Sequence, residues 1–94
     1  MNFGQAIDAL KSGKKVSRAG WNGKGMWLVL VPGRKDVPLH PGTPYADALP
    51  GKEECEILPH IDMWTVNAAD RRAMLPGWLA SQSDMLAEDW SIVE

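Results

Sequence analysis

Apolar residues near the start of the chain recur at the spacing of one helix face. The positions at i, i+4 and i+7 are Phe3, Ile7 and Leu10. Asn2 and Gln5 form the capping-box pattern that begins a helix, because each side chain can bond the backbone N–H of the other residue. We therefore predict a short amphipathic helix that begins after Asn2 and ends at the Ser12-Gly13 pair.

Farther along, short apolar runs and alternating segments predict strands. The expected strands cover residues 14–17, 27–31, 57–66 and 89–93. Ser81 and Asp84 repeat the capping-box pattern, so residues 82–87 should form one or two helical turns. The sum predicts an α+β fold, in which a small antiparallel sheet of four or five strands carries the N-terminal helix and a second short helix on one face.

Residues 32–56 are the least regular part of the pattern. Five prolines and three glycines fall within them, and both residue types are unfavourable inside helices and central strands. Tyr45 and Leu49 are among the apolar residues that could anchor the segment to the body or to a neighbouring subunit. We predict a single domain over residues 1–94 with an irregular loop, rich in proline and glycine, at about residues 32–56.

Charge is divided unevenly along the chain, although the net charge is only −2. Residues 1–35 carry seven basic side chains and one acidic one, whereas residues 36–94 carry three basic and eleven acidic ones. An acidic chain does not suit binding to duplex nucleic acid, which depends on many phosphate contacts. The basic third could hold one or two phosphates of a small ligand, or the two halves could attract each other across a fold or a subunit contact.

Neither a membrane span nor an export signal is expected. The longest apolar run, residues 26–31, is far shorter than the roughly 20 residues that cross a bilayer. The first residues lack the basic and apolar regions of a signal peptide, and the single cysteine, Cys55, cannot form an internal disulfide. These features favour the cytosol.

Residues 19–27 combine groups that suit a planar, polar, anionic ligand. Trp21 and Trp27 offer flat indole faces, and Asn22 offers an amide that can read a hydrogen-bonding edge. The glycines between them allow a ligand to approach the backbone closely. The alternative is a tight turn between two elements, with both tryptophans in the core.

A second combination of this kind lies at residues 78–84. Trp78 precedes a predicted helix start that carries Ser81, Gln82 and Asp84, and the N–H groups of a helix start suit an anionic or carbonyl ligand. The alternative is that Ser81 and Asp84 only cap the helix and Trp78 only packs.

Groups suited to catalysis or metal binding are sparse. His60 and Asp62 share one face of a predicted strand and could act with Asp84 or Glu88, but their spacing matches no zinc signature. A lone His-x-Asp pair is more typical of a surface hydrogen bond. The pattern indicates no catalytic residues, no metal and no cofactor.

Three stretches together are similar to a known family. They are residues 2–18, residues 20–26 with the sequence GWNGKGM, and residues 78–90 with the sequence WLASQSDMLAEDW. Their order and wording closely resemble the type-two Thoeris anti-defence family of small phage and prophage proteins, and residues 59–63 resemble its central strand.

The resemblance implies a molecular sponge that is not an enzyme. Such proteins bind the cyclic ADP-ribose-type signal of a bacterial defence system without cleaving it, in the cytoplasm of the infected host. Members form homotetramers with pockets between subunits, and some also bind cyclic di- or trinucleotides at separate sites. The resemblance implies these ligand-binding residues: Trp21, Asn22, Trp78, Ser81, Gln82 and Asp84.

Two other classes of function stay open from the residues alone. A small nucleotide hydrolase would depend on the acid and base candidates His60, Asp62, Asp84 and Glu88. A phage inhibitor that binds a host protein directly would use the acidic C-terminal half.

Overall fold

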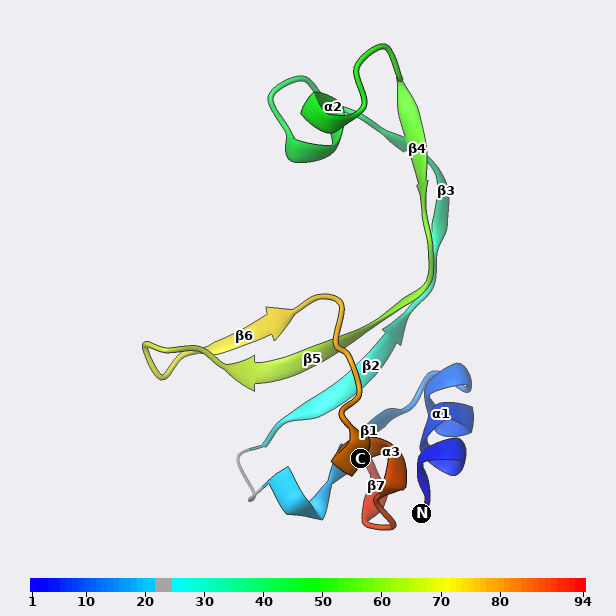
Figure 1. The fold of residues 1–94 in the computed structure, drawn as a ribbon, viewed down its shortest axis with the longest axis vertical. Helices are drawn as coiled ribbons and strands as arrows, with labels where there is room; N and C mark the ends of the chain where they lie inside the picture. Colours follow the sequence, from blue (N-terminus) through cyan, green and yellow to red (C-terminus); the bar gives the residue numbers. More distant parts are fainter. Residues whose placement is uncertain (22–24) are drawn as a thin grey trace.

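The computed structural model describes residues 1–21 and 25–94 (Figure 1). Its elements in chain order are α1 (Phe3–Lys11), β1 (Lys15–Arg18), the 3-10 turn η1 (Ala19–Trp21), β2 (Trp27–Val31), β3 (Arg34–Pro38), α2 (Pro44–Ala48), β4 (Glu54–Ile57), β5 (His60–Val66), β6 (Arg72–Leu75), α3 (Gln82–Leu86) and β7 (Trp90–Val93). The predicted α+β class is confirmed.

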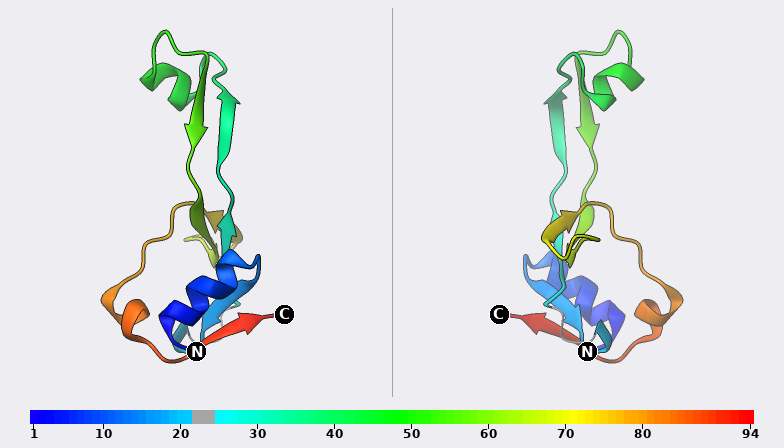
Figure 2. Two further views of the ribbon diagram at one scale, coloured as in Figure 1. Left: turned by 90° about the vertical axis from the view of Figure 1, so that its right-hand side faces the viewer. Right: turned by 90° about the vertical axis from the view of Figure 1, so that its left-hand side faces the viewer.

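Five strands form one antiparallel sheet in the order β6-β5-β2-β1-β7. The first strand of the chain, β1, and the last, β7, are therefore neighbours, and every residue of β1 pairs with a residue of β7. Helix α1 packs across β1, β2 and β7 and covers one face of the sheet (Figure 2).

Helix α1 forms as the sequence predicts. Asn2 Oδ1 accepts from the Gln5 backbone at 2.8 Å, and Gln5 Oε1 accepts from the Asn2 backbone at 2.8 Å, which completes the capping box. The helix ends at Ser12, and Gly13 follows with φ of 86°, a conformation that favours glycine.

The core lies between α1 and the sheet. Its fully buried members are Ala6, Leu10, Val16, Leu28 and Trp90. Val16 is paired with Leu28, so both side chains project from the same side of the sheet toward the helix.

The opposite side of the sheet carries a pair of tryptophans. Trp27 is paired with Trp64, and their rings stack at a centroid distance of 6.0 Å with 24° between the planes. The Lys15 ammonium lies 5.0 Å from the Trp27 ring centroid, within the range of a cation–π contact.

Residues 32–56, predicted as an irregular loop, contain instead a two-stranded arm of β3 and β4 with α2 at its tip. The arm projects from the end of β2 and β5 away from the body (Figures 1 and 2). The prolines fit because Pro38 closes a strand and Pro44 takes the first turn of α2, where its missing N–H is harmless.

The expected strand over residues 57–66 was also wrong in its extent. Leu58 and Pro59 separate β4 from β5, and β6 was not predicted because Arg72–Leu75 shows no clear alternation. A turn joins β5 to β6, and Asn67 Oδ1 stabilises it by accepting from the backbones of Ala69 and Arg71. In the described part of the chain, no helix is both long and apolar enough to cross a membrane.

Candidate functional site

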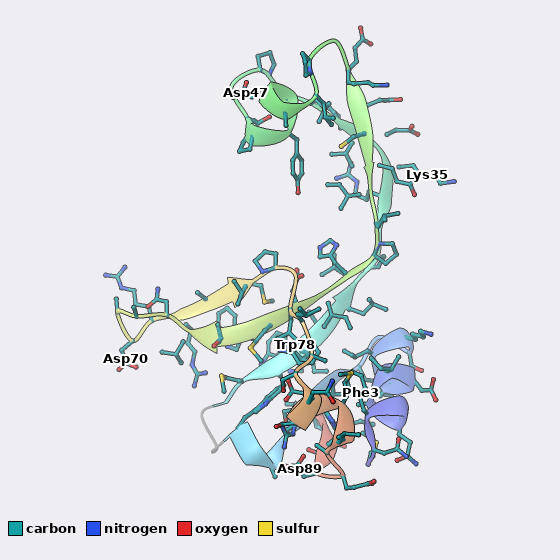
Figure 3. All side chains as sticks on the ribbon, viewed as in Figure 1. Phe3, Lys35, Asp47, Asp70, Trp78 and Asp89 are labelled. Carbon is teal, nitrogen blue, oxygen red and sulfur yellow. The ribbon has the colours of Figure 1, made fainter. Side chains whose placement is uncertain are left out.

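Three tryptophans from distant parts of the sequence meet beside α3. Trp21 and Trp90 approach edge to face with centroids 5.3 Å apart, and Trp78 lies 6.3 Å from each of them. Trp90 is buried, whereas Trp21 and Trp78 are only half-buried. We call these three residues the tryptophan cluster; Figure 3 labels Trp78 in it.

The start of α3 is tied to the cluster through Asp84. Ser81 Oγ accepts from the Asp84 backbone at 3.1 Å, and Asp84 Oδ2 accepts from the Ser81 backbone at 2.9 Å, as the capping box predicts. The indole N–H of Trp90 donates to the carbonyl oxygen of Asp84 at 2.9 Å. The predicted capping box of Ser81 and Asp84 is therefore confirmed.

Arg18 connects this helix start to β1 and β7. Its Nη1 lies 2.9 Å from Asp84 Oδ1, and its Nε lies 2.9 Å from Asp89 Oδ1. Asp89 Oδ2 also accepts from the Gly20 backbone at 2.8 Å. Because Gly20 belongs to η1, this network fixes the turn that carries Trp21.

The network changes the acidity of its members. The hydrogen bonds from Arg18, followed by one from a backbone N–H, lower the pKa of Asp89. Burial alone raises the pKa of Asp84, but hydrogen bonds from Ser81, Arg18 and Trp21 outweigh it and lower that pKa overall. The hydrogen bonds to Asp89 and Asp84 raise the pKa of Arg18. All three groups are therefore charged at neutral pH.

A hollow of about 380 Å³ opens beside Trp21. Its wall consists of Ser17, Arg18, Ala19, Trp21, Gly25, Met26, Trp27, Ser91 and Val93. Ser17 and Ser91 are paired across β1 and β7, so their side chains project together from the sheet face that also carries Trp27. Indole and hydroxyl groups of this kind can stack on and hydrogen-bond a planar polar ligand.

The described residues form two further hollows, of which the first shares Met26 with the 380 Å³ hollow. One of about 540 Å³ is lined by Met26, Thr65, Val66, Asn67, Asp70 and Arg72 at the β5–β6 turn. One of about 360 Å³ lies on the arm and is lined by Tyr45, Leu49, Cys55, Glu56, Ile57 and Leu58.

The structure brings together some of the predicted site residues. Trp21 lines the 380 Å³ hollow; Trp78 and Asp84 contact Trp21 but do not belong to the hollow's wall. Ser81 and Gln82 are exposed at the start of α3, outside the hollow's wall. Asn22 lies outside the described residues.

Sequence reasoning missed Arg18, Ser17 and Ser91. A signal for Arg18 was present, since a basic residue at the end of β1 precedes the tryptophan motif directly. Its two acidic partners could not be found this way, because they lie 66 and 71 residues away.

Among the acid and base candidates, Asp62 and Asp84 are already engaged by other groups of the protein. His60 Nε2 lies 3.6 Å from Asp62 Oδ2, but Asp62 Oδ1 accepts from the Gly77 backbone at 3.0 Å. Asp84 is engaged by Arg18. Across residues 1–21 and 25–94, no three His, Cys, Asp or Glu side chains gather closely enough to hold a metal ion.

Comparison with known proteins assigns nearly the whole chain to one family. A family model described as the Tad2-like, Thoeris anti-defense 2-like domain matches residues 1–93. The chain is also similar to the protein "Thoeris anti-defense 2" of Bacillus phage SP01. The two are 34% identical over an alignment of 99 positions, gaps included, which covers 99% of this chain and 94% of the phage protein.

Proposed function

The chain belongs to the Thoeris anti-defense 2-like family and has a phage anti-defence role, and from this premise we propose its mechanism. The protein binds a cyclic ADP-ribose-type signalling nucleotide and holds it without cleaving it. The defence effector that needs the signal then stays inactive. The signal is made inside the infected bacterium, so the protein acts in the host cytoplasm.

One observation carries this proposal: Trp21 belongs both to the tryptophan cluster and to the wall of the 380 Å³ hollow. Its contacts with Trp78 and Trp90 hold the indole in place, so little side-chain entropy remains to be lost when a base stacks on it. Trp27 provides a second aromatic surface in the same wall. Ser17 and Ser91 add two hydroxyls to this wall, whereas the guanidinium of Arg18 is already paired with Asp84 and Asp89.

Binding without catalysis agrees with the state of the acidic groups. A general acid must hold a proton near neutral pH, but the pKa of Asp84 is lowered by its hydrogen bonds despite burial. Asp62 is nearly buried and accepts a backbone hydrogen bond, so its carboxylate has a structural partner. These engagements favour sequestration over the hydrolase alternative.

We also propose that the protein is a homotetramer with ligand pockets between subunits. Several leucines are strongly exposed in the single chain: Leu79 is 89% exposed, Leu86 76% and Leu58 69%. The arm adds Tyr45 and Leu49, and a two-stranded ribbon alone is marginally stable in water. A second copy would bury this apolar surface and close the open side of the hollow.

The proposal extends to cyclic oligonucleotides at a second location. The 540 Å³ hollow at the β5–β6 turn is separate from the tryptophan cluster and contains the basic Arg72 and the amide of Asn67. Guanidinium and amide groups are of the kinds that bind a phosphate and a base edge, although Asn67 Oδ1 here already accepts from the backbones of Ala69 and Arg71.

Calorimetric titration tests the proposed function. Cyclic ADP-ribose isomers are titrated into the wild-type chain, with linear ADP-ribose as the control for ring shape. We expect at least one cyclic isomer to bind with a stoichiometry fixed by the oligomer and the linear control to bind more weakly. If every isomer gives only the heat of dilution, the proposal is rejected, and direct binding to a host protein is favoured instead.

A further inference from the structure

The segment that carries Trp78 has few backbone partners. Strand β6 ends at Leu75, which is paired with Met63 of β5, and α3 begins only at Gln82. Between these points, the Trp78 N–H donates to the carbonyl oxygen of Ile61 at 2.7 Å.

A side-chain hydrogen bond also anchors this segment. The Gly77 N–H donates to Asp62 Oδ1 at 3.0 Å, and Gly77 has φ of 79°, which a residue with a Cβ would adopt only with strain. Asp62 lies on β5, so its carboxylate fixes the turn that precedes Trp78 to an interior strand of the sheet.

The setting of Asp62 indicates a structural purpose for the carboxylate. Asp62 is only 6% exposed, and a buried carboxylate is costly unless its oxygens have partners. The second carboxylate oxygen of Asp62 faces His60, because His60 Nε2 lies 3.6 Å from Asp62 Oδ2. His60 Nδ1 donates to the Leu58 carbonyl oxygen at 2.9 Å, so the imidazole is itself held beside the carboxylate.

We propose that Asp62 is a positioning residue for Trp78. By holding Gly77, its carboxylate sets the position from which the Trp78 indole contacts Trp21 and Trp90. The His60–Asp62 pair, which resembles a catalytic couple in the sequence, thus supports the aromatic platform. The effect on the protein alone is independent of ligand; only its consequence for affinity rests on the proposed function.

Amide hydrogen exchange measured by NMR tests the positioning role without any ligand. In the wild-type chain, we expect the Gly77 and Trp78 amides to be protected. Asp62→Ala should speed their exchange by about ten-fold or more, as the loss of a hydrogen bond to a charged acceptor implies. Asp62→Asn keeps an acceptor oxygen, so it should restore protection to within about three-fold of wild type.

A matched control comes from the other end of β6. Asn67→Ala removes two hydrogen bonds that backbone N–H groups donate to a side-chain oxygen in the β5–β6 turn, and it should leave Gly77 and Trp78 protected. If Asp62→Ala does not fold, the wild-type measurement decides. Exchange of Gly77 at the rate of an unstructured glycine would overturn the proposal, as would unchanged exchange in a folded Asp62→Ala.

Affinity provides the second readout. With the tightest-binding cyclic ADP-ribose isomer as the probe, Asp62→Ala should bind about ten-fold more weakly and Asp62→Asn close to wild type. Equal losses in both variants would overturn the positioning role, because a purely charge-based contribution would then explain the effect. If no isomer binds the wild-type chain, the proposed function fails, and the exchange measurement still decides the role of Asp62.

Discussion

Arg18 and Asp84 lie 66 residues apart in the sequence and form an ion pair with 2.9 Å between Nη1 and Oδ1. The same guanidinium binds Asp89, so one side chain joins β1 to both the start of α3 and the residue before β7. This contact brings the two tryptophan motifs together. The site is therefore assembled by long-range pairing rather than by either motif alone.

The pH dependence of stability should reflect this network. The pKa values of Asp84 and Asp89 lie below their ordinary value of 3.8, so the unfolded chain binds more protons than the folded one in acid. Their stabilising contribution is fully present above about pH 3.8 and is lost as the pH falls through the lowered values. Urea unfolding between pH 6 and pH 2.5 measures this loss.

The control for the pH experiment is Arg18→Gln, which removes the charge that both carboxylates share. Its free energy of unfolding should be lower at neutral pH and should depend less steeply on pH in the acid range. An equally steep acid dependence in Arg18→Gln would contradict the assignment of the network.

The cap of α3 gives a second prediction. Ser81→Ala removes the hydroxyl that accepts from the Asp84 backbone, and loss of an N-cap of this kind costs about 0.5–2 kcal/mol of stability. Ser83→Ala, an exposed position inside the same helix, serves as the control and should leave stability unchanged or slightly raised. Chemical denaturation of both variants measures the difference, and equal stability of the two would contradict the capping role.

Trp21 gives the most direct prediction about the pocket. Trp21→Ala should weaken nucleotide binding by about 1–3 kcal/mol, the usual contribution of an aromatic platform under one base. That is a loss of roughly 5- to 150-fold in affinity. The thermal midpoint should also fall, because Trp21 packs against Trp90 in the folded chain.

Trp21→Phe separates the two effects, since a smaller ring retains part of the packing. We expect a higher midpoint than for Trp21→Ala, with an affinity between those of Trp21→Ala and wild type. Wild-type affinity in a folded Trp21→Ala variant would show that Trp21 is only a packing residue.

Oligomeric state can be measured by light scattering at micromolar concentration. The tetramer predicts a mass about four times the 10.3 kDa of the chain. Leu58→Asp places a charge on the exposed apolar surface at the base of the arm and should reduce that mass. Lys35→Ala, at an exposed polar position of β3 (Figure 3), is the control that should leave it unchanged. A monomeric wild-type protein would refute the tetramer.

Local signals explain what could be predicted from the sequence. The capping boxes at Asn2 and Ser81 lie within three residues of their partners, so both helices were found with nearly correct bounds. Strand β2 was found because its apolar run is bounded by turn residues.

The remaining features depend on pairing across the chain. The arm was missed because prolines were read as excluding strands, although each strand of a two-stranded ribbon has a free edge where proline is tolerated. The partners of Arg18 and the contact of Asp62 with Gly77 could not be predicted, because no local spacing encodes them.

The central claim is that the protein sequesters a cyclic nucleotide without changing it. The measurement is to incubate the wild-type chain with each cyclic ADP-ribose isomer, remove unbound ligand, denature the protein by heat and identify the released molecule by mass spectrometry and chromatography. We predict recovery of the intact cyclic isomer in proportion to the protein, and a loss of this recovery in Trp21→Ala. Release of a linear or otherwise altered product would show catalysis and contradict sequestration.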